Sequence, residues 1–217
     1  MSGQSFVSQR TRAKVRSAIT PIALAAGKLG LTPNALTVIG FLISAGAAAA
    51  AAAQLWLVSA ALVIIGGSFD LLDGGLAWAQ NRVTRFGAYL DSTLDRWGEG
   101  VVYIGIVAGA SAAGFVAGAV LAAAAAVSSF QVRYTRAKAE SLKLHGEVGI
   151  APRAERLVVL TIGLVLAGVS GGVGSGARGQ LWLGATLGLI FVSASITAIQ
   201  RTWHVRQQLG NEEHRAK

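Results

Sequence analysis

Apolar runs long enough to cross a bilayer dominate this sequence and constrain its fold more than any other feature. Only 13% of the 217 residues are charged and 53% are hydrophobic, whereas a soluble domain carries about 25% charged residues. A helix needs about 20 apolar residues to cross a hydrocarbon core of ~30 Å. We therefore predict an all-α integral membrane protein with six transmembrane helices. The expected spans cover residues 33–53, 56–78, 86–110, 115–139, 156–169 and 181–203.

The two ends of the chain differ from this apolar middle. Residues 10–28 mix basic and apolar side chains at helical spacing, which predicts an amphipathic helix lying in the membrane interface rather than crossing it. The last residues are polar. We expect three regions: a cytoplasmic N-terminus with the interfacial helix (1–30), a six-helix membrane domain (31–205) and a polar cytoplasmic tail (206–217).

Positive charge predicts the orientation of the chain and the kind of partner it binds. Of the 19 Lys and Arg residues, all but Arg178 fall on the side of both termini if the chain spans six times. The positive-inside rule then places both termini in the cytoplasm of a multi-pass cell-membrane protein. With a net charge of +9 in so apolar a chain, anionic headgroups and phosphorylated substrates are better partners than nucleic acid.

Four aspartates interrupt the apolar pattern between residues 69 and 100. Asp70 and Asp73 end the second expected span, and Asp91 and Asp95 lie in the first turns of the third. Residues three or four apart share a face of a helix, and carboxylates at membrane depth are costly and usually functional. Four such groups repel one another unless a cation lies among them. Oxygen ligands suit hard divalent ions such as Mg²⁺ or Mn²⁺, and the absence of cysteine excludes a thiolate site.

A structural role for these aspartates is the alternative. They could cap helices or pair with Arg82, Arg85 and Arg96. That alternative explains a single aspartate more readily than four at this spacing.

The full pattern is Asp70-x-x-Asp73-Gly74-x-x-Ala77, followed after Trp78 by eight residues and then Gly87-x-x-x-Asp91-x-x-x-Asp95. It resembles the signature of the CDP-alcohol phosphotransferase family, DxxDGxxAR, eight residues, then GxxxDxxxD. One position departs, because Trp78 stands where the family has an arginine that helps to hold the CDP-linked donor.

This resemblance implies a homodimer of six-span subunits, each with a cavity open to the cytoplasm. In the implied reaction, an acceptor hydroxyl attacks the β-phosphate of a CDP-alcohol and CMP leaves. Two Mg²⁺ ions, with Mn²⁺ as an alternative, would offset the charge of the pyrophosphate donor, and Asp95 would also be the general base. The implied metal ligands are Asp70, Asp73, Asp91 and Asp95. The implied contacts to a CDP-diacylglycerol donor are Thr32, Pro33, Asn34, Ala35, Gly74, Ala77, Trp78 and Thr84.

A second cluster is cationic and lies at the same membrane side as the aspartates. Its members are Arg133, Arg136, Lys138, Arg153, Arg156 and Arg201. Snorkelling and positive-inside charge are the ordinary explanation of such residues. Arginine, however, is the side chain best suited to bidentate phosphate binding. Converging arginines therefore predict an acceptor that itself carries phosphate.

Several segments resemble one branch of the family, the actinobacterial phosphatidylinositol phosphate synthases: LTPN at 31–34, TRFGAYLDSTLDR at 84–96, YTRAKAE at 134–140, PRAERL at 152–157 and IQR at 199–201. The implied reaction joins CDP-diacylglycerol and 1D-myo-inositol 3-phosphate to give phosphatidylinositol phosphate and CMP. The implied acceptor ligands are Arg136, Lys138, Arg156 and Arg201.

Three alternatives stay open on the sequence. Phosphatidylglycerophosphate synthase, or another CDP-alcohol phosphotransferase, would use the same chemistry on a different acceptor. An ion transporter could use buried carboxylates, although these belong near the midplane on paired repeats. A structural membrane protein would carry out no catalysis.

Overall fold

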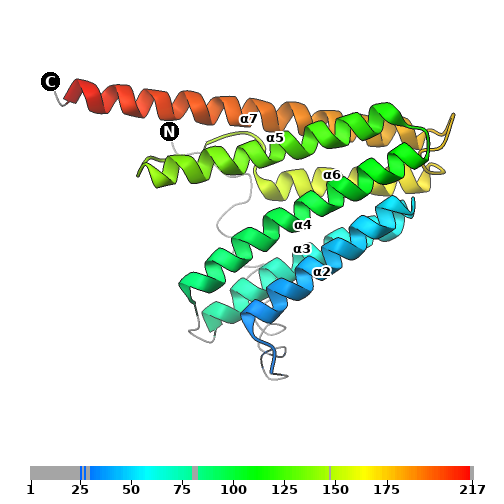
Figure 1. The fold of residues 1–217 in the computed structure, drawn as a ribbon, viewed down its shortest axis with the longest axis horizontal. Coiled ribbons are helices and arrows are strands. Elements are labelled where there is room, and N and C mark those ends of the chain that lie inside the picture. Colours follow the sequence, from blue (N-terminus) through cyan, green and yellow to red (C-terminus); the bar gives the residue numbers. More distant parts are fainter. Residues whose placement is uncertain (1–24, 26, 28–29, 80–82, 147, 216–217) are drawn as a thin grey trace. The chain divides into compact units, whose positions relative to one another are not determined.

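Every helix or strand in the described part of the chain is an α-helix. The computed structural model describes residues 25, 27, 30–79, 83–146 and 148–215, and Figure 1 shows the six helices. They are α2 (Pro33–Ala52), α3 (Trp56–Ala79), α4 (Arg85–Ala112), α5 (Val116–Ser141), α6 (Arg153–Val169) and α7 (Gly179–Arg215). The all-α prediction is confirmed for these residues. The predicted interfacial helix over 10–28 lies almost wholly outside them.

Four of these helices are long and apolar enough to cross a membrane: Pro33–Ala52, Trp56–Leu76, Val116–Ser141 and Gly179–Asn211. They match the first, second, fourth and sixth predicted spans. The predicted third and fifth spans are helical, but they are not both long and apolar enough to be counted with these four. Helix α6 has only 17 residues, about 26 Å at 1.5 Å per residue. Helix α4 carries Asp91, Asp95, Arg96 and Glu99 within its sequence. A multi-pass membrane protein is confirmed, and the count of six spans stays a prediction.

The chain divides into two compact units, and the boundary between them in the sequence falls within α4. The first takes in α2, α3 and α4 as far as Ile106, and the second takes in the chain from Val107 onward, with α5, α6 and α7.

In the first unit, glycines let the helices approach closely. A Cβ on Gly40 of α2 would lie 3.1 Å from the Phe69 Cβ of α3, and a Cβ on Gly66 of α3 would lie 3.1 Å from the Ser44 hydroxyl of α2. Small residues allow such contacts between membrane helices, where van der Waals packing holds the helices together.

Next to this contact, a small apolar cluster is built around two buried leucines. Its members are Leu36 and Leu76, with Leu31, Phe69 and Leu72 packed against them.

In the second unit, α7 packs along both α5 and α6 (Figure 1). A Cβ on Gly163 of α6 would lie 2.4 Å from a methyl carbon of Thr186 on α7, so the two helices touch directly. The outer faces of this unit keep large apolar side chains exposed, among them Val120, Val158 and Leu189. Exposed apolar surface of this kind is what a lipid-facing helix presents.

Candidate active site

The first unit brings together the helices that carry the four aspartates of the motif. Asp70 on α3, and Asp91 and Asp95 on α4, are each half-buried. An oxygen of Asp70 lies 3.6 Å from the position of a Cβ on Gly40, so this carboxylate lies against α2. The side chain of Asp73 lies outside the described residues.

Ser44 of α2 touches both helices that carry these carboxylates. Its hydroxyl lies 3.1 Å from the Cβ position of Gly66 on α3 and 3.3 Å from that of Gly98 on α4. Gly66 is one turn before Asp70, and Gly98 is three residues after Asp95. Asp70 and Asp95 therefore each lie within one helical turn of the point where the three helices meet.

The first turn of α4 is set by Thr84. Its hydroxyl accepts a 2.9 Å hydrogen bond from the Gly87 amide, and its carbonyl accepts from the Ala88 amide, which makes Thr84 the N-cap. Asp91 and Asp95 then follow seven and eleven residues later on the same face of the helix. The cap thus sets where α4 begins, and the helical repeat places both aspartates on one face.

The first turn of α2 meets the first turn of α4. Thr32 caps α2 by accepting a 3.2 Å bond from the Ala35 amide, with Pro33 at the first helical position. The side-chain oxygen of Asn34 lies 3.2 Å from the Cβ position of Gly87. Two helix N-termini, both with partial positive charge, are thereby brought together at one end of the first unit.

Gly74 is exposed. Apart from its two chain neighbours, a Cβ built on it would meet nothing within 4 Å among the described residues. That a donor approaches Gly74 stays a prediction. The side chains of Ala77 and Trp78, two further predicted donor contacts, lie outside the described residues.

The donor atoms on these helices suit a divalent metal, although the described side chains do not complete a site. They offer oxygen atoms alone, from half-buried carboxylates, which is the chemistry that Mg²⁺ and Mn²⁺ prefer. Among the described side chains, no three His, Asp or Glu groups converge closely enough to hold an ion. That set omits Asp73, the fourth predicted ligand, so the two-metal site stays a prediction.

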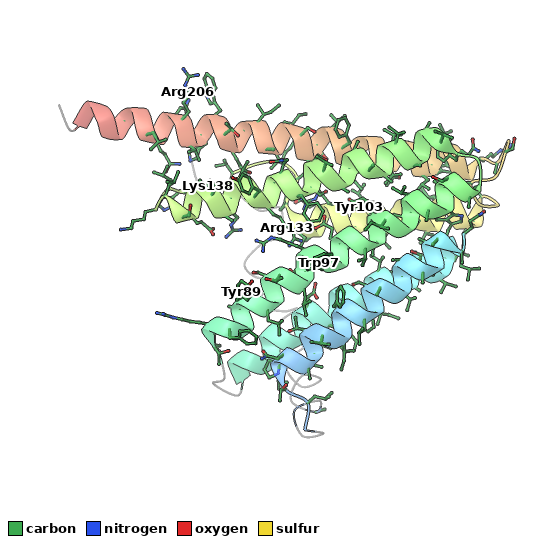
Figure 2. The ribbon with its side chains drawn as sticks, in the orientation of Figure 1. Tyr89, Trp97, Tyr103, Arg133, Lys138 and Arg206 are labelled. Atoms are coloured by element: carbon green, nitrogen blue, oxygen red, sulfur yellow. The ribbon has the colours of Figure 1, made fainter. Side chains whose placement is uncertain are left out.

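The predicted acceptor ligands lie in the second unit, and two of them are exposed. Lys138 lies in the last turn of α5 (Figure 2). Arg136 forms a 2.8 Å ion pair with Glu140, one turn along the same helix, and both side chains are about half exposed, at 45% and 55%. The spacing of four residues could have predicted this pair from the sequence.

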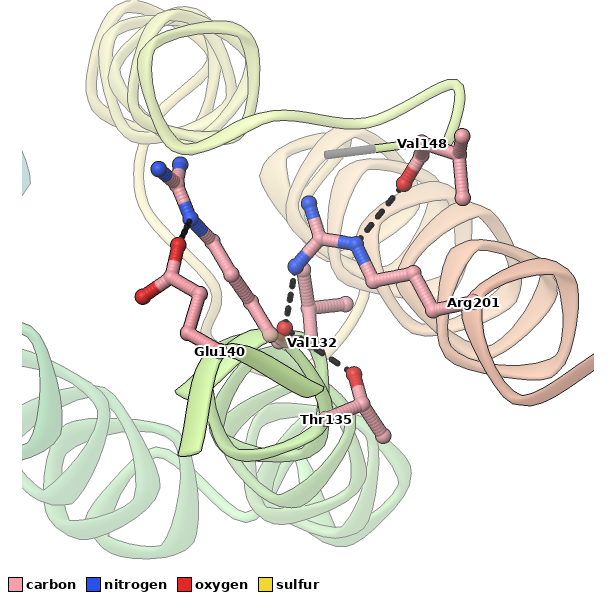
Figure 3. A network of polar contacts seen from close by, with 6 residues as sticks. Val132, Thr135, Glu140, Val148 and Arg201 are labelled. Atoms are coloured by element: carbon pink, nitrogen blue, oxygen red, sulfur yellow. Dashed lines mark hydrogen bonds and ion pairs between the residues drawn. The ribbon is translucent and has the colours of Figure 1, made fainter. Parts of the chain in front are cut away.

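Arg156 and Arg201 are buried, with 3% and 7% of their surfaces exposed. Arg156 Nη1 donates to the Ala151 carbonyl at 2.8 Å. Arg201 Nε donates to the Val148 carbonyl at 2.7 Å, and its Nη1 donates to the Val132 carbonyl of α5 (Figure 3). Buried guanidinium groups must be hydrogen-bonded, and here backbone carbonyls supply partners. The partners Val148 and Ala151 could not be predicted from the sequence, because they belong to an irregular loop.

The comparisons with known proteins decide the family. A model of the CDP-alcohol phosphatidyltransferase family matches residues 30–199. The chain belongs to this family. The resemblance carried by the aspartate motif is therefore confirmed, and the protein is a CDP-alcohol phosphotransferase.

Relatives of this CDP-alcohol phosphotransferase include enzymes from archaea and actinobacteria. It is 41% identical over 152 residues to the archaetidylinositol phosphate synthase of Methanothermobacter thermautotrophicus, covering 70% of this chain and 74% of that one. It is 32% identical over 219 residues to the phosphatidylinositol phosphate synthase of Mycobacteroides abscessus, covering 97% and 91%.

Solved structures of a related phosphotransferase have the same fold. The crystal structure of Mycobacterium tuberculosis phosphatidylinositol phosphate synthase with CDP-DAG bound is 30% identical, with a TM-score of 0.77 over 86% of this chain and 92% of that one. A second structure of that enzyme, in complex with manganese and citrate, has the same TM-score and covers 86% and 88%.

Proposed function

We propose that this phosphotransferase transfers the phosphatidyl group of CDP-diacylglycerol to 1D-myo-inositol 3-phosphate, giving phosphatidylinositol phosphate and CMP in phospholipid biosynthesis. The observation that carries the proposal is the likeness to phosphatidylinositol phosphate synthases over nearly the whole chain. The names of the archaeal and actinobacterial relatives share the inositol phosphate part and differ in the lipid part. This favours inositol phosphate as the acceptor.

Asp70, Asp73, Asp91 and Asp95 would hold two Mg²⁺ ions, or Mn²⁺, the ion present in one structure of the tuberculosis enzyme. When bound, such ions neutralise the pyrophosphate and stabilise the charge that builds on departing CMP. Asp95 accepts the proton of the acceptor hydroxyl as its oxygen bonds to the β-phosphorus and the bond from that phosphorus to the CMP oxygen breaks.

The donor headgroup would lie where α2 and α4 begin. The hydroxyls of Thr32 and Thr84 accept amide hydrogens as caps, and a hydroxyl that accepts can also donate. Two adjoining helix N-termini favour an anionic pyrophosphate, and the open space at Gly74 leaves room for it. Pro33, Asn34, Ala35, Ala77 and Trp78 complete the proposed donor contacts.

The acceptor phosphate would be held by Arg136, Lys138, Arg156 and Arg201. A guanidinium carries five N–H donors, so backbone anchoring and phosphate binding are compatible in one arginine side chain.

We further propose a homodimer in the cell membrane, with six spans in each subunit and the active site open to the cytoplasm. CDP-diacylglycerol would enter this site from the surrounding lipid.

An acceptor panel tests this function. Purified protein with CDP-diacylglycerol and Mg²⁺ should release CMP with the highest kcat/KM for inositol 3-phosphate, and with far lower values for glycerol 3-phosphate and free inositol. A preference for glycerol 3-phosphate would instead identify a phosphatidylglycerophosphate synthase. No CMP release with any polyol would contradict both functions and favour the transporter or a structural role.

A further inference from the structure

One face of α7 holds the chain between α5 and α6 against the second unit. Thr197, Arg201 and Gln208 lie at intervals of four and seven residues, so they share this face. They bond to the backbone of His145, Val148 and Ala151. We name residues 145–146 and 148–151 the anchored loop. The sequence offers no signal for these contacts, since Gln208 lies 63 residues beyond its partner.

Both polar atoms of the Gln208 side-chain amide form hydrogen bonds to the backbone of the anchored loop. Its Nε2 donates to the His145 carbonyl at 2.8 Å, and its Oε1 accepts from the His145 amide at 3.0 Å. Further along the loop, Thr197 Oγ1 accepts from the Ala151 amide at 3.1 Å. Thr197 is fully buried, at 0% exposure. The loop is thus fixed at both ends by side chains that carry no charge.

The anchored loop also supplies carbonyls that accept from the buried arginines, one between the two anchors and one at Ala151 itself. Arg201 donates to Val148 and Arg156 donates to Ala151. Gly149 permits the close fit, because its φ of +133° disfavours side chains and a Cβ there would lie 2.2 Å from a methyl carbon of Thr197. A shift of the loop would therefore move both carbonyls, and with them the Arg156 guanidinium and the Nε side of the Arg201 guanidinium, whose Nη1 also donates to the Val132 carbonyl of α5.

We propose that Gln208 is a positioning residue for the acceptor site, which acts through the anchored loop to set the direction of the Arg156 and Arg201 side chains. Thr197 does the same from the other end. This inference rests on the proposed function, because it takes these arginines as ligands of the acceptor phosphate. Gln208 itself contacts no reacting atom.

The test measures KM for each substrate in the full-length purified protein. Gln208→Ala should raise KM for inositol 3-phosphate about five- to tenfold, the effect of losing an ordinary hydrogen bond. KM for CDP-diacylglycerol and kcat should stay within about twofold of wild type. Gln207→Ala is the matched control, because Gln207 is exposed on the same part of α7.

A second pair of variants repeats the test at the other anchor. Thr197→Val removes the hydroxyl at nearly constant volume and should also raise the acceptor KM, whereas Thr197→Ser keeps the hydroxyl and should restore it. An unchanged acceptor KM in both Gln208→Ala and Thr197→Val, or an equal rise in the donor KM, would overturn the inference alone. A wild-type protein that releases no CMP with inositol 3-phosphate would overturn the proposed function, and this inference with it.

Discussion

Trp78 is the residue at which this chain departs from the aspartate signature of its family. The four aspartates and both glycines of that signature are present in the sequence, so all the predicted metal ligands are retained. The family arginine that helps to hold the donor is missing, and Trp cannot supply a charge-assisted bond to phosphate. The departure therefore bears on donor affinity more than on the chemical step.

Restoring the family residue tests that assignment. Trp78→Arg should lower KM for CDP-diacylglycerol about tenfold or more, since a hydrogen bond to a charged group is worth roughly 1.5–3 kcal/mol. KM for the acceptor should stay constant in the same assay and serve as the internal control. A higher donor KM in Trp78→Arg would show that the tryptophan itself contributes to donor binding.

Arg136 offers a test that separates binding from stability. Its ion pair with Glu140 is about half exposed, and exposed pairs four residues apart on a helix contribute only about 0.3–0.5 kcal/mol. Arg136→Gln should therefore leave Tm nearly unchanged while raising the acceptor KM about tenfold, the effect of one charge-assisted phosphate bond. Glu140→Gln removes the same pair and should leave the acceptor KM near that of wild type. Equal effects from the two variants would contradict a ligand role for Arg136.

At the scale of elements, the spacing of residues in the sequence predicted which residues share a helix face and where a helix begins, but it did not predict which helices pack together. The intervals between the aspartates place Asp91 and Asp95 on one face of α4, and the Thr32–Pro33 pair begins α2 as its residue types favour. The contact between Ser44 and Gly98 could not be foreseen, because small residues permit close approach without specifying the partner helix. Likewise, Arg201 was predicted as a ligand, but its bond to Val148 depends on the course of a loop.

Close packing of α2 and α4 gives a prediction at this scale. A Cβ on Gly105 would lie 2.2 Å from the Ala48 carbonyl oxygen, which is backbone and cannot move aside alone. Gly105→Ala should therefore destabilise the protein by about 1–3 kcal/mol, as overpacking does, and lower Tm in a thermal melt. Gly188→Ala is the control, because a Cβ there meets nothing within 4 Å and Ala favours helix over Gly. Equal Tm values for the two variants would contradict the close contact.

For the whole molecule, hydropathy predicted the membrane class, which is confirmed, and six spans, four of which are helices long and apolar enough to cross a membrane. Of the other two helices, α6 is short, with 17 residues, and α4 carries several charged residues. Helix α4 carries two of the predicted metal ligands together with Arg96 and Glu99, and α6 begins with Arg153 and holds Arg156 in its first turns. Ionisable residues inside membrane helices are costly and usually serve function. The charged residues of α4 and α6 therefore include proposed site residues, as do those of α3, α5 and α7.

Transfer of labelled inositol 3-phosphate into lipid is the most direct measurement of the proposed reaction. Wild-type protein with CDP-diacylglycerol and Mg²⁺ should form labelled lipid and CMP in equal amounts, and chelation of the metal should abolish both. Asp95→Asn should lower the rate about 10²–10⁴-fold, the range for loss of a general base, whereas Glu99→Gln, one turn further along α4, should retain most of it. No labelled lipid from wild type, or undiminished transfer by Asp95→Asn, would contradict the proposed reaction.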